Sequence, residues 1–324
     1  MANSSQMFSK TLSATSEYNI SCSLDISFFV FARQNSSFAY IFLAMGSIIC
    51  SVTALVGNTI VILALWRSKS MHSATKALFY SLAISDLATG LTQPLFVAYL
   101  LGAAWDNAWL YCTVGLPFSL TTTFFSMVSL WTLSIIAVDR YLALHLLTRY
   151  KTVVTVKLIV LALVLGWLIS AFCTVSVIFT VKFRQIVSDV VVFICIVISL
   201  YFYGRNYLTL RQQKLHVQAL RSFQMEHYRK SLNSMFLIFC LFLLTYVPII
   251  SIFVFVIIEG FGSTSLFIVD ILTLIVIANS SINPVVYCMR VRDLKVEAIR
   301  VIQSIFLCWP VIWFKKKKVA PLPA

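Results

Sequence analysis

The sequence predicts an all-α membrane protein: a seven-transmembrane helix bundle with a short amphipathic interfacial helix after the seventh span. Of its 324 residues, 60% are hydrophobic and only 11% are charged, whereas about a quarter of the residues in a soluble domain are charged. Long stretches carry no charge at all, and basic residues gather in alternate connections. These three observations exclude an ordinary soluble protein.

Seven stretches are long enough for a helix of about 20 residues to cross the hydrocarbon core of a bilayer. Five of them contain no Asp, Glu, Lys or Arg: residues 34–66, 107–138, 158–181, 231–258 and 271–289. Another, residues 77–105, is interrupted only by Asp86. A weaker candidate runs from about Ile186 to Leu210, with Asp189 near one end and Arg205 near the other. We therefore expect seven spans.

The distribution of basic residues indicates the orientation of the bundle. Only Lys10, Arg33, Lys182 and Arg184 are expected on one side of the membrane, and all other basic residues on the other side. The positive-inside rule makes the second side cytosolic. We therefore expect a multi-pass plasma-membrane protein with an extracellular N-terminus and a cytoplasmic C-terminus. The net charge of +14 then reflects topology, and no nucleic acid is expected as a partner.

Four regions follow from this topology. They are an extracellular tail at residues 1–37, the bundle at 38–289, the interfacial helix at 290–304 and a basic cytoplasmic tail at 305–324. The interfacial helix alternates apolar and charged residues, so it should lie on the inner leaflet. Cys308 is a candidate for palmitoylation, an unmodified thiol being the alternative. The basic residues 315–318 should contact anionic membrane lipids.

Glycosylation sequons support an extracellular N-terminal tail. Asn3, Asn19 and Asn35 each begin an Asn-X-Ser triplet, and we expect at least one of them to carry a glycan. Chance is the alternative, because Ser-rich tails generate such triplets easily.

Asp86 is the only ionisable residue deep inside an expected span, so it marks either a functional site or a buried polar network that fixes helix packing. Its candidate partners are the polar residues Asn58, Ser129, Asn279, Ser280 and Asn283. Carboxylate, hydroxyl and amide oxygens together suit a hard cation. Spacing alone does not identify the ion.

Two further patterns suggest a mobile bundle. At the end of the third span stands Asp139-Arg140-Tyr141, where Arg140 can reach the interface and still pair with its neighbour. Pro248 in the sixth span and Asn283-Pro284-Val-Val-Tyr287 in the seventh interrupt their helices, which frees backbone groups and permits hinge motion. Each pattern alone is weakly specific.

Taken together, these residues resemble the rhodopsin-like (class A) G protein-coupled receptors. The markers, at least one in each span, are Gly57-Asn58, Leu82-Ala-x-x-Asp86, Asp139-Arg140-Tyr141, Trp167, Tyr203, Pro248 and Asn283-Pro284-x-x-Tyr287. The match runs from about Tyr40 to Leu294. A minimal second outer loop, placed at about Val181 to Asp189, and Cys195 where span five usually carries proline look similar to the melanocortin, cannabinoid and adenosine branch.

The resemblance implies a receptor, not an enzyme, that senses an extracellular ligand and activates a heterotrimeric G protein through movement of helix 6. The residues it assigns to activation and coupling are Asp139, Arg140, Tyr141, Tyr203, Tyr246, Pro248, Asn283, Pro284 and Tyr287. It implies one possible ion, an allosteric sodium held by Asp86, Ser129, Asn279, Ser280 and Asn283, and no other cofactor.

The ligand pocket implied by the resemblance is mostly apolar and uncharged. It comprises Thr122, Thr123, Ser126, Tyr246, Ile249, Ile250, Phe253 and Thr273. We therefore expect a neutral, lipid-like or small hydrophobic ligand, with ordinary core packing as the alternative.

Two departures from the family carry expectations of their own. The second outer loop has no cysteine, so Cys112 lacks its usual partner, and we expect either a Cys22–Cys112 disulfide or two free thiols. Tyr228 stands where an acid often locks Arg140, which predicts a weak resting lock and ligand-independent signalling.

Competing classes are disfavoured by missing residues. A retinal protein needs a lysine in the seventh span, which has none, and a membrane zinc hydrolase needs intramembrane ligands, whereas all four histidines are expected in the cytosol. A transporter or channel with Asp86 as coupling residue remains the alternative, although no internal repeat supports it.

Overall fold

The structure is a computed structural model of the chain. It describes residues 32, 35–69, 71–146, 149–216, 240, 243–256, 258–260 and 262–308. The sequence-based predictions for Asn3, Asn19, Cys22, Tyr228 and residues 315–318 lie outside these ranges, as do the side chains of Tyr287 and Cys308.

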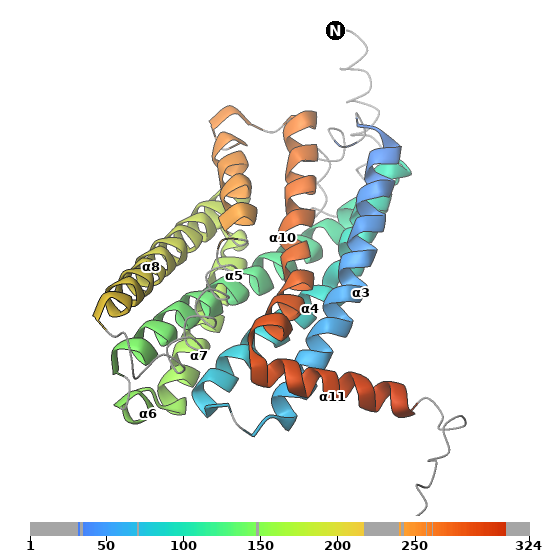
Figure 1. Cartoon of the computed structure of the whole chain (residues 1–324). Helices are drawn as coiled ribbons and strands as arrows, with labels where there is room; N and C mark the ends of the chain where they lie inside the picture. The colour runs from blue at the N-terminus through green and yellow to red at the C-terminus, as the bar shows by residue number, and fades with distance from the viewer. Residues whose placement is uncertain are drawn as a thin grey trace, which may run out of the picture.

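Within the described residues the fold is entirely helical (Figure 1). The helices are α3 (Ser37–Arg67), α4 (Ser73–Ala104), α5 (Ala108–Leu146), α6 (Tyr150–Val153), α7 (Val156–Val175), the 3-10 turn η3 (Ser176–Ile178), α8 (Val181–His216), α10 (Ser263–Arg290) and α11 (Arg292–Cys308). A further apolar helix, Leu243–Val256, lies between α8 and α10 in the chain.

The helices confirm the membrane-bundle prediction. Six of the described helices are long and apolar enough to cross a membrane: α3, α4, α5, α7, α8 and α10. The expected sixth span coincides with Leu243–Val256, a shorter helix in the described part of the chain. This order along the chain is that of a seven-helix bundle.

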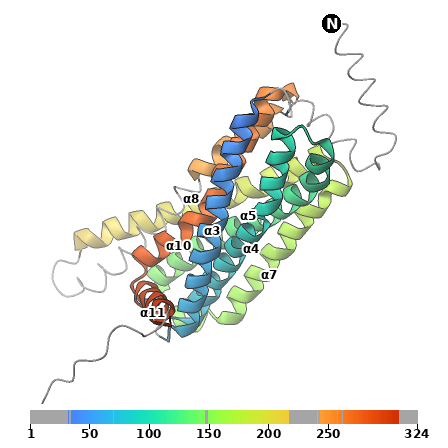
Figure 2. The same cartoon turned by 90° about the vertical axis from the view of Figure 1, so that its right-hand side faces the viewer.

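The packing order places α4 and α5 at the centre. α3 packs against α4 and α10, α4 packs against α5, and α5 contacts α7 and α8. α3 and α7 therefore lie at opposite sides of the bundle (Figure 2). Both are the least buried of the spanning helices, and they turn large apolar side chains such as Phe42, Ile49, Leu161 and Leu168 outward. Lipid is the solvent that such faces require.

Gly57 explains how α3 and α10 come together. A Cβ atom at Gly57 would lie 2.9 Å from both Cβ and Cγ of Pro284, closer than two carbon atoms pack. Small residues allow helix backbones to approach in membranes. The glycine of the first span and the proline of the seventh therefore form one contact.

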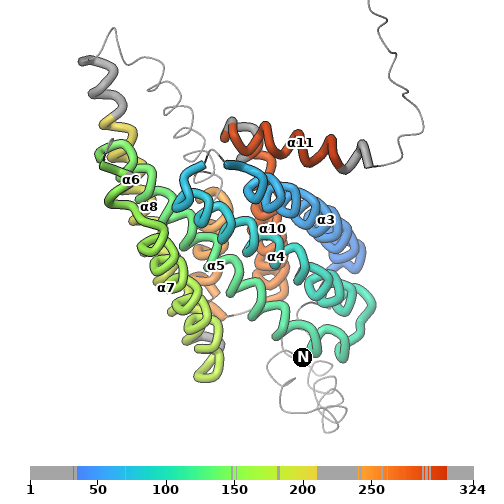
Figure 3. The backbone as a smooth tube through the Cα atoms, turned by 90° about the horizontal axis from the view of Figure 1, so that it is seen from below, coloured from blue at the N-terminus to red at the C-terminus, as the bar shows by residue number. Residues whose placement is uncertain are grey.

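The helix after the seventh span crosses one end of the bundle (Figures 1 and 3). α11 buries Leu294, Ala298 and Val301, and its Ser304 hydroxyl accepts a 3.3 Å hydrogen bond from Arg67 of α3. Alternation of apolar and charged residues produces this one-sided burial. The end of the bundle that α11 crosses is called the α11 end, and the other end of the bundle is called the opposite end.

The sequence-based position of the second outer loop was wrong. The connection between α7 and α8 consists of residues 176–180, and residues 181–189 already form the first turns of α8. The Thr180 hydroxyl accepts a 3.0 Å hydrogen bond from the Phe183 amide, which is how a threonine caps a helix. A further bond, from Gln185 to Asp189 at 2.9 Å, joins two residues four apart on the same helix face.

Candidate functional site

Asp86 lies at the centre of the bundle with a fully buried side chain. Its Oδ1 accepts hydrogen bonds from the hydroxyls of Ser129 (3.1 Å) and Ser280 (2.9 Å), and its Oδ2 accepts one from the Asn283 amide (2.8 Å). Ser85, which the sequence reasoning missed, adds a hydroxyl 2.8 Å from that of Ser129. The carboxylate thus joins α4, α5 and α10 through side-chain donors.

Two of the expected partners do not reach Asp86. Asn58 donates instead to the backbone carbonyls of Ala54 (2.9 Å) and Ser280 (3.1 Å). Asn279 is 3% exposed, and neither its amide nitrogen nor its amide oxygen has a hydrogen-bond partner among the described residues. Asn58 therefore joins α3 to α10, and Asn279 stays a buried amide beside the network.

The oxygen atoms of this region suit a hard cation. The amide oxygens of Asn58, Asn279 and Asn283 are all buried without a hydrogen-bond partner within the described residues. An unpaired buried oxygen is costly, and water or a sodium ion satisfies it. Together with the Asp86 carboxylate, these oxygens are the ligand type that sodium takes.

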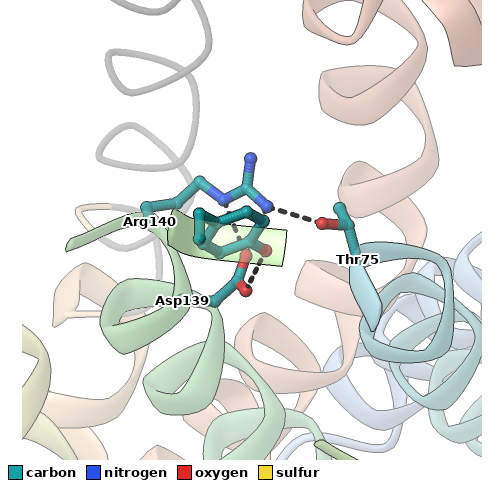
Figure 4. A network of polar contacts seen from close by, with 4 residues as sticks. Thr75, Asp139 and Arg140 are labelled. Atoms are coloured by element: carbon teal, nitrogen blue, oxygen red, sulfur yellow. Dashed lines mark hydrogen bonds and ion pairs between the residues drawn. The ribbon is translucent and has the colours of Figure 1, made fainter. Parts of the chain in front are cut away.

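A second polar network lies near the α11 end, where Arg140 links α5 to α4 (Figure 4). Arg140 forms an ion pair with Asp139, and its guanidinium donates a 2.8 Å hydrogen bond to the Thr75 hydroxyl. The Tyr150 hydroxyl donates to the other oxygen of the Asp139 carboxylate at 2.6 Å. Asp139 is therefore held from two sides.

Burial and the neighbouring charge of Asp139 raise the pKa of Tyr150 to about 12. Its ordinary pKa is about 10. Because the proton is held more tightly, Tyr150 remains a hydrogen-bond donor at any physiological pH.

The other expected activation residues surround the Arg140 network. The Tyr141 ring packs against Phe202 of α8 at 5.1 Å between centroids and against His145 at 3.9 Å. Tyr203 of α8 is buried. These contacts bring α8 against the end of α5 that carries Arg140.

The remaining markers lie on helix Leu243–Val256 and on α10. Tyr246, two residues before Pro248, is buried and donates a 3.3 Å hydrogen bond from its hydroxyl to the Ser126 carbonyl of α5. Pro284 lies inside α10, one residue after Asn283. This hydrogen bond therefore joins helix Leu243–Val256 to α5 two residues before Pro248.

A cavity of about 490 Å³ opens between these helices toward the opposite end. All eight residues expected in the ligand pocket line it: Thr122, Thr123, Ser126, Tyr246, Ile249, Ile250, Phe253 and Thr273. The eight residues therefore line a single cavity.

Three charged residues that the sequence reasoning missed also line the cavity: Arg184, Asp189 and Asp270. Arg184 is 8% exposed and donates a 2.9 Å hydrogen bond to the Thr123 hydroxyl. Arg184, expected in the second outer loop, lies on α8, as does Asp189, which was expected at the boundary between that loop and the fifth span. Asp270 lies one position before the expected seventh span, in the second turn of α10. Placing the starts of α8 and α10 correctly in the sequence would have identified all three residues as parts of the bundle.

Two predicted modification sites lie near the opposite end. Cys112 is disulfide-bonded, whereas Cys50, Cys173, Cys195, Cys240 and Cys288 are free. The Asn35 amide nitrogen, the atom that would carry a glycan, donates a 3.1 Å hydrogen bond to the Ser263 carbonyl. The pairing of Cys112 with Cys22 and the glycosylation of Asn35 stay predictions.

Comparison with known proteins gives a consistent result. Residues 57–187 match a family described as 7 transmembrane receptor (rhodopsin family). The chain is 26% identical to adenosine receptor A3 of Ovis aries over 295 residues, which cover 81% of the chain and 90% of that receptor. It is 25% identical to trace amine-associated receptor 9 of Mus musculus, covering 73% and 77%, and 23% identical to the histamine H2 receptor of Cavia porcellus, covering 76% of each.

Proposed function

Because this chain belongs to the rhodopsin-like (class A) G protein-coupled receptors and is related to the adenosine branch, we propose that it detects an extracellular small ligand in the cavity and activates a heterotrimeric G protein by movement of helix 6. The chain is a multi-pass membrane receptor and not an enzyme. The transporter or channel alternative finds no support, because the matched family and relatives are receptors.

The observation that carries this proposal is the position of Tyr246. Its side chain lines the cavity and donates a hydrogen bond to α5, and it lies two residues before Pro248. Proline permits the helix to bend at this point. A ligand that changes the contact of Tyr246 with Ser126 therefore acts at the hinge of the sixth helix.

A ligand shifts such a bundle only by its difference in affinity for the two states. In the resting state Asp139 and Thr75 hold Arg140. On activation Arg140 would leave these partners and extend toward the G protein, while Tyr203 and Tyr287 turn inward. The inner side of the membrane is then the α11 end, which agrees with the positive-inside rule.

We further propose a sodium ion as allosteric ligand of Asp86, Ser129, Ser280, Asn283 and Asn279. The unpaired amide oxygens around Asp86 support it. Sodium would neutralise the carboxylate and tie α4, α5 and α10 together, which favours the resting state.

The neutral, lipid-like ligand expected from the sequence is not carried forward. Arg184, Asp189 and Asp270 give the wall charged groups that a neutral ligand would leave unpaired. The apolar residues Ile249, Ile250 and Phe253 still favour a ligand with a hydrophobic body. Membrane lipid contacts, glycosylation of the N-terminal tail and palmitoylation of Cys308 remain part of the proposal.

The test is nucleotide exchange on purified heterotrimeric G proteins of each major class, with the receptor in lipid nanodiscs and no ligand added. We expect exchange above that of empty nanodiscs for at least one class, and loss of the excess in Arg140→Ala. Folded receptor that stimulates none of the classes, with or without a library of small ligands, would contradict the proposal.

A further inference from the structure

We infer that the ligand cavity contains a subsite for a cationic amine, formed by the Asp270 carboxylate and the aromatic rings of Tyr99, Tyr111 and Phe118. The inference deepens the proposed function, on which it rests, by assigning a chemical class to the ligand. It is drawn from the burial, contacts and charge of the cavity wall.

Asp270 is a carboxylate without sufficient partners. It is 4% exposed and lines the cavity, and its Oδ2 atom has no hydrogen-bond partner within the described part of the chain. A buried carboxylate that lacks partners is expensive unless a cation or further donors meet it. An ammonium group entering the cavity supplies both the charge and the donors.

Three aromatic rings, those of Tyr99, Tyr111 and Phe118, line the same cavity as Asp270. The Tyr99 and Tyr111 rings lie 4.3 Å apart between centroids, and Tyr99 and Phe118 lie 5.8 Å apart. Their hydroxyls are joined, since those of Tyr99 and Tyr111 are 2.5 Å from each other, and Tyr99 also neighbours the Asp270 carboxylate. Aromatic faces attract ammonium groups, most of all when the site is shielded from water.

The balance of charge in the wall favours a cation over an anion. Within the described ranges, the charged residues that line the cavity are Arg184, Asp189 and Asp270. Arg184 and Asp189 attract each other and lie five residues apart on α8, so their opposite charges partly compensate. Asp270 on α10 has no basic side chain paired with it among the described residues. A monocation would give the carboxylate a partner of opposite charge, and an anion would not.

The apolar residues of the cavity wall indicate that the rest of the ligand is hydrophobic. Ile249, Ile250 and Phe253 of the sixth helix line the same cavity. A ligand with an ammonium group at Asp270 and an apolar body therefore reaches the helix that carries the Tyr246 hinge. This arrangement couples amine binding to helix 6.

Ligand stabilisation of the purified receptor in nanodiscs tests the inference without a G protein. The probes are 2-phenylethylammonium, its uncharged isostere propylbenzene and the anion 3-phenylpropanoate, each compared with buffer in a thermal unfolding assay. We expect the ammonium probe alone to raise the melting temperature, and Asp270→Asn to weaken its apparent affinity by about tenfold or more. Glu259→Gln is the matched control, because Glu259 is an exposed acid near the same end.

The inference is overturned if the ammonium probe gives no shift, if either other probe stabilises the receptor as well, or if Asp270→Asn binds the ammonium probe as wild type does. If Asp270→Asn fails to fold, the inference is tested with Thr273→Cys in the otherwise unchanged receptor, by measuring how fast the new thiol is modified. We expect the cavity thiol to react at least tenfold faster with a trimethylammonium methanethiosulfonate than with a sulfonate one, and equal rates would overturn the inference. Neither readout involves G protein, so failure of nucleotide exchange alone rejects only the proposed coupling.

Discussion

The Tyr150 hydroxyl donates a 2.6 Å hydrogen bond to Asp139 Oδ1 while Arg140 pairs with Asp139 Oδ2. One carboxylate therefore receives a neutral donor from α6 and a cation from its own helix. The neutral donor lies in the connection between α5 and α7, so the resting arrangement of Arg140 depends on a segment outside the spanning helices.

Replacing Tyr150 by phenylalanine should raise ligand-independent signalling. The change removes one donor to a charged acceptor, which contributes about 1.5–3 kcal/mol. If this bond is made only while Arg140 pairs with Asp139, the population with Arg140 released should rise by about tenfold to a hundredfold from a small wild-type value. Basal nucleotide exchange per folded receptor measures the effect. Tyr201→Phe, at an exposed tyrosine of α8, is the control, and an unchanged Tyr150→Phe basal rate would contradict the role of this bond.

Thr75→Val should act in the same direction through Arg140 itself. The 2.8 Å bond from the Arg140 guanidinium to Thr75 holds Arg140 against α4, and valine keeps the shape of threonine without the acceptor. We expect basal exchange to rise several-fold with little loss of thermal stability. Thr75→Ser retains the hydroxyl and should behave like wild type; if serine and valine raise the rate equally, packing and not the hydrogen bond is responsible.

The sequence predicts the polar network around Asp86 better than the network around Arg140. Asp86 stands out because an acid in an apolar span requires partners, and the polar residues of the third and seventh spans are the available ones. Its contacts with Ser129, Ser280 and Asn283 follow from that requirement. Thr75 and Tyr150 carry no such signal, since a hydroxyl near a helix end is satisfied equally well by water.

Errors in the predicted helix boundaries changed which residues were expected in the cavity wall. The apolar residues of this wall were predictable from the family pattern. Arg184 was expected in a loop and Asp189 at the boundary of that loop with the fifth span, because a polar stretch beside a span is typical of a connection. The Thr180 cap starts α8 earlier, and this turns both side chains into the bundle. The start of α8 thus adds two charged side chains to the cavity wall, and the start of α10 adds Asp270.

Asp86→Asn should abolish the effect of sodium on stability. If the ion is bound by the Asp86 carboxylate, sodium chloride should raise the melting temperature of wild type over choline chloride at equal ionic strength, by several degrees at saturating concentration. The asparagine variant keeps the shape and the acceptor but lacks the charge, so its melting temperature should be the same in both salts. A sodium effect that survives in Asp86→Asn would place the ion elsewhere.

The Cys112 disulfide is predicted to join Cys22. Cys112 is bonded and five other cysteines are free. Mass spectrometry of receptor alkylated without reduction should yield a cross-linked peptide pair containing both residues, and Cys22→Ser should leave Cys112 open to alkylation. Alkylation of both residues in the unreduced wild type would refute the pairing.

Gly166→Ala should destabilise the receptor, although alanine is the better helix former. A Cβ atom at Gly166 of α7 would overlap the indole ring of Trp131, whose Nε1 donates a 2.9 Å hydrogen bond to the Ala162 carbonyl. Overpacking of this kind costs about 1–3 kcal/mol, which exceeds the roughly 1 kcal/mol of helix propensity that alanine adds. We expect a melting temperature several degrees lower in nanodiscs. At Gly204 of α8 a Cβ would meet nothing within 4 Å, so Gly204→Ala should raise the melting temperature slightly, and a fall in both variants would show that helix packing around Trp131 is not the cause.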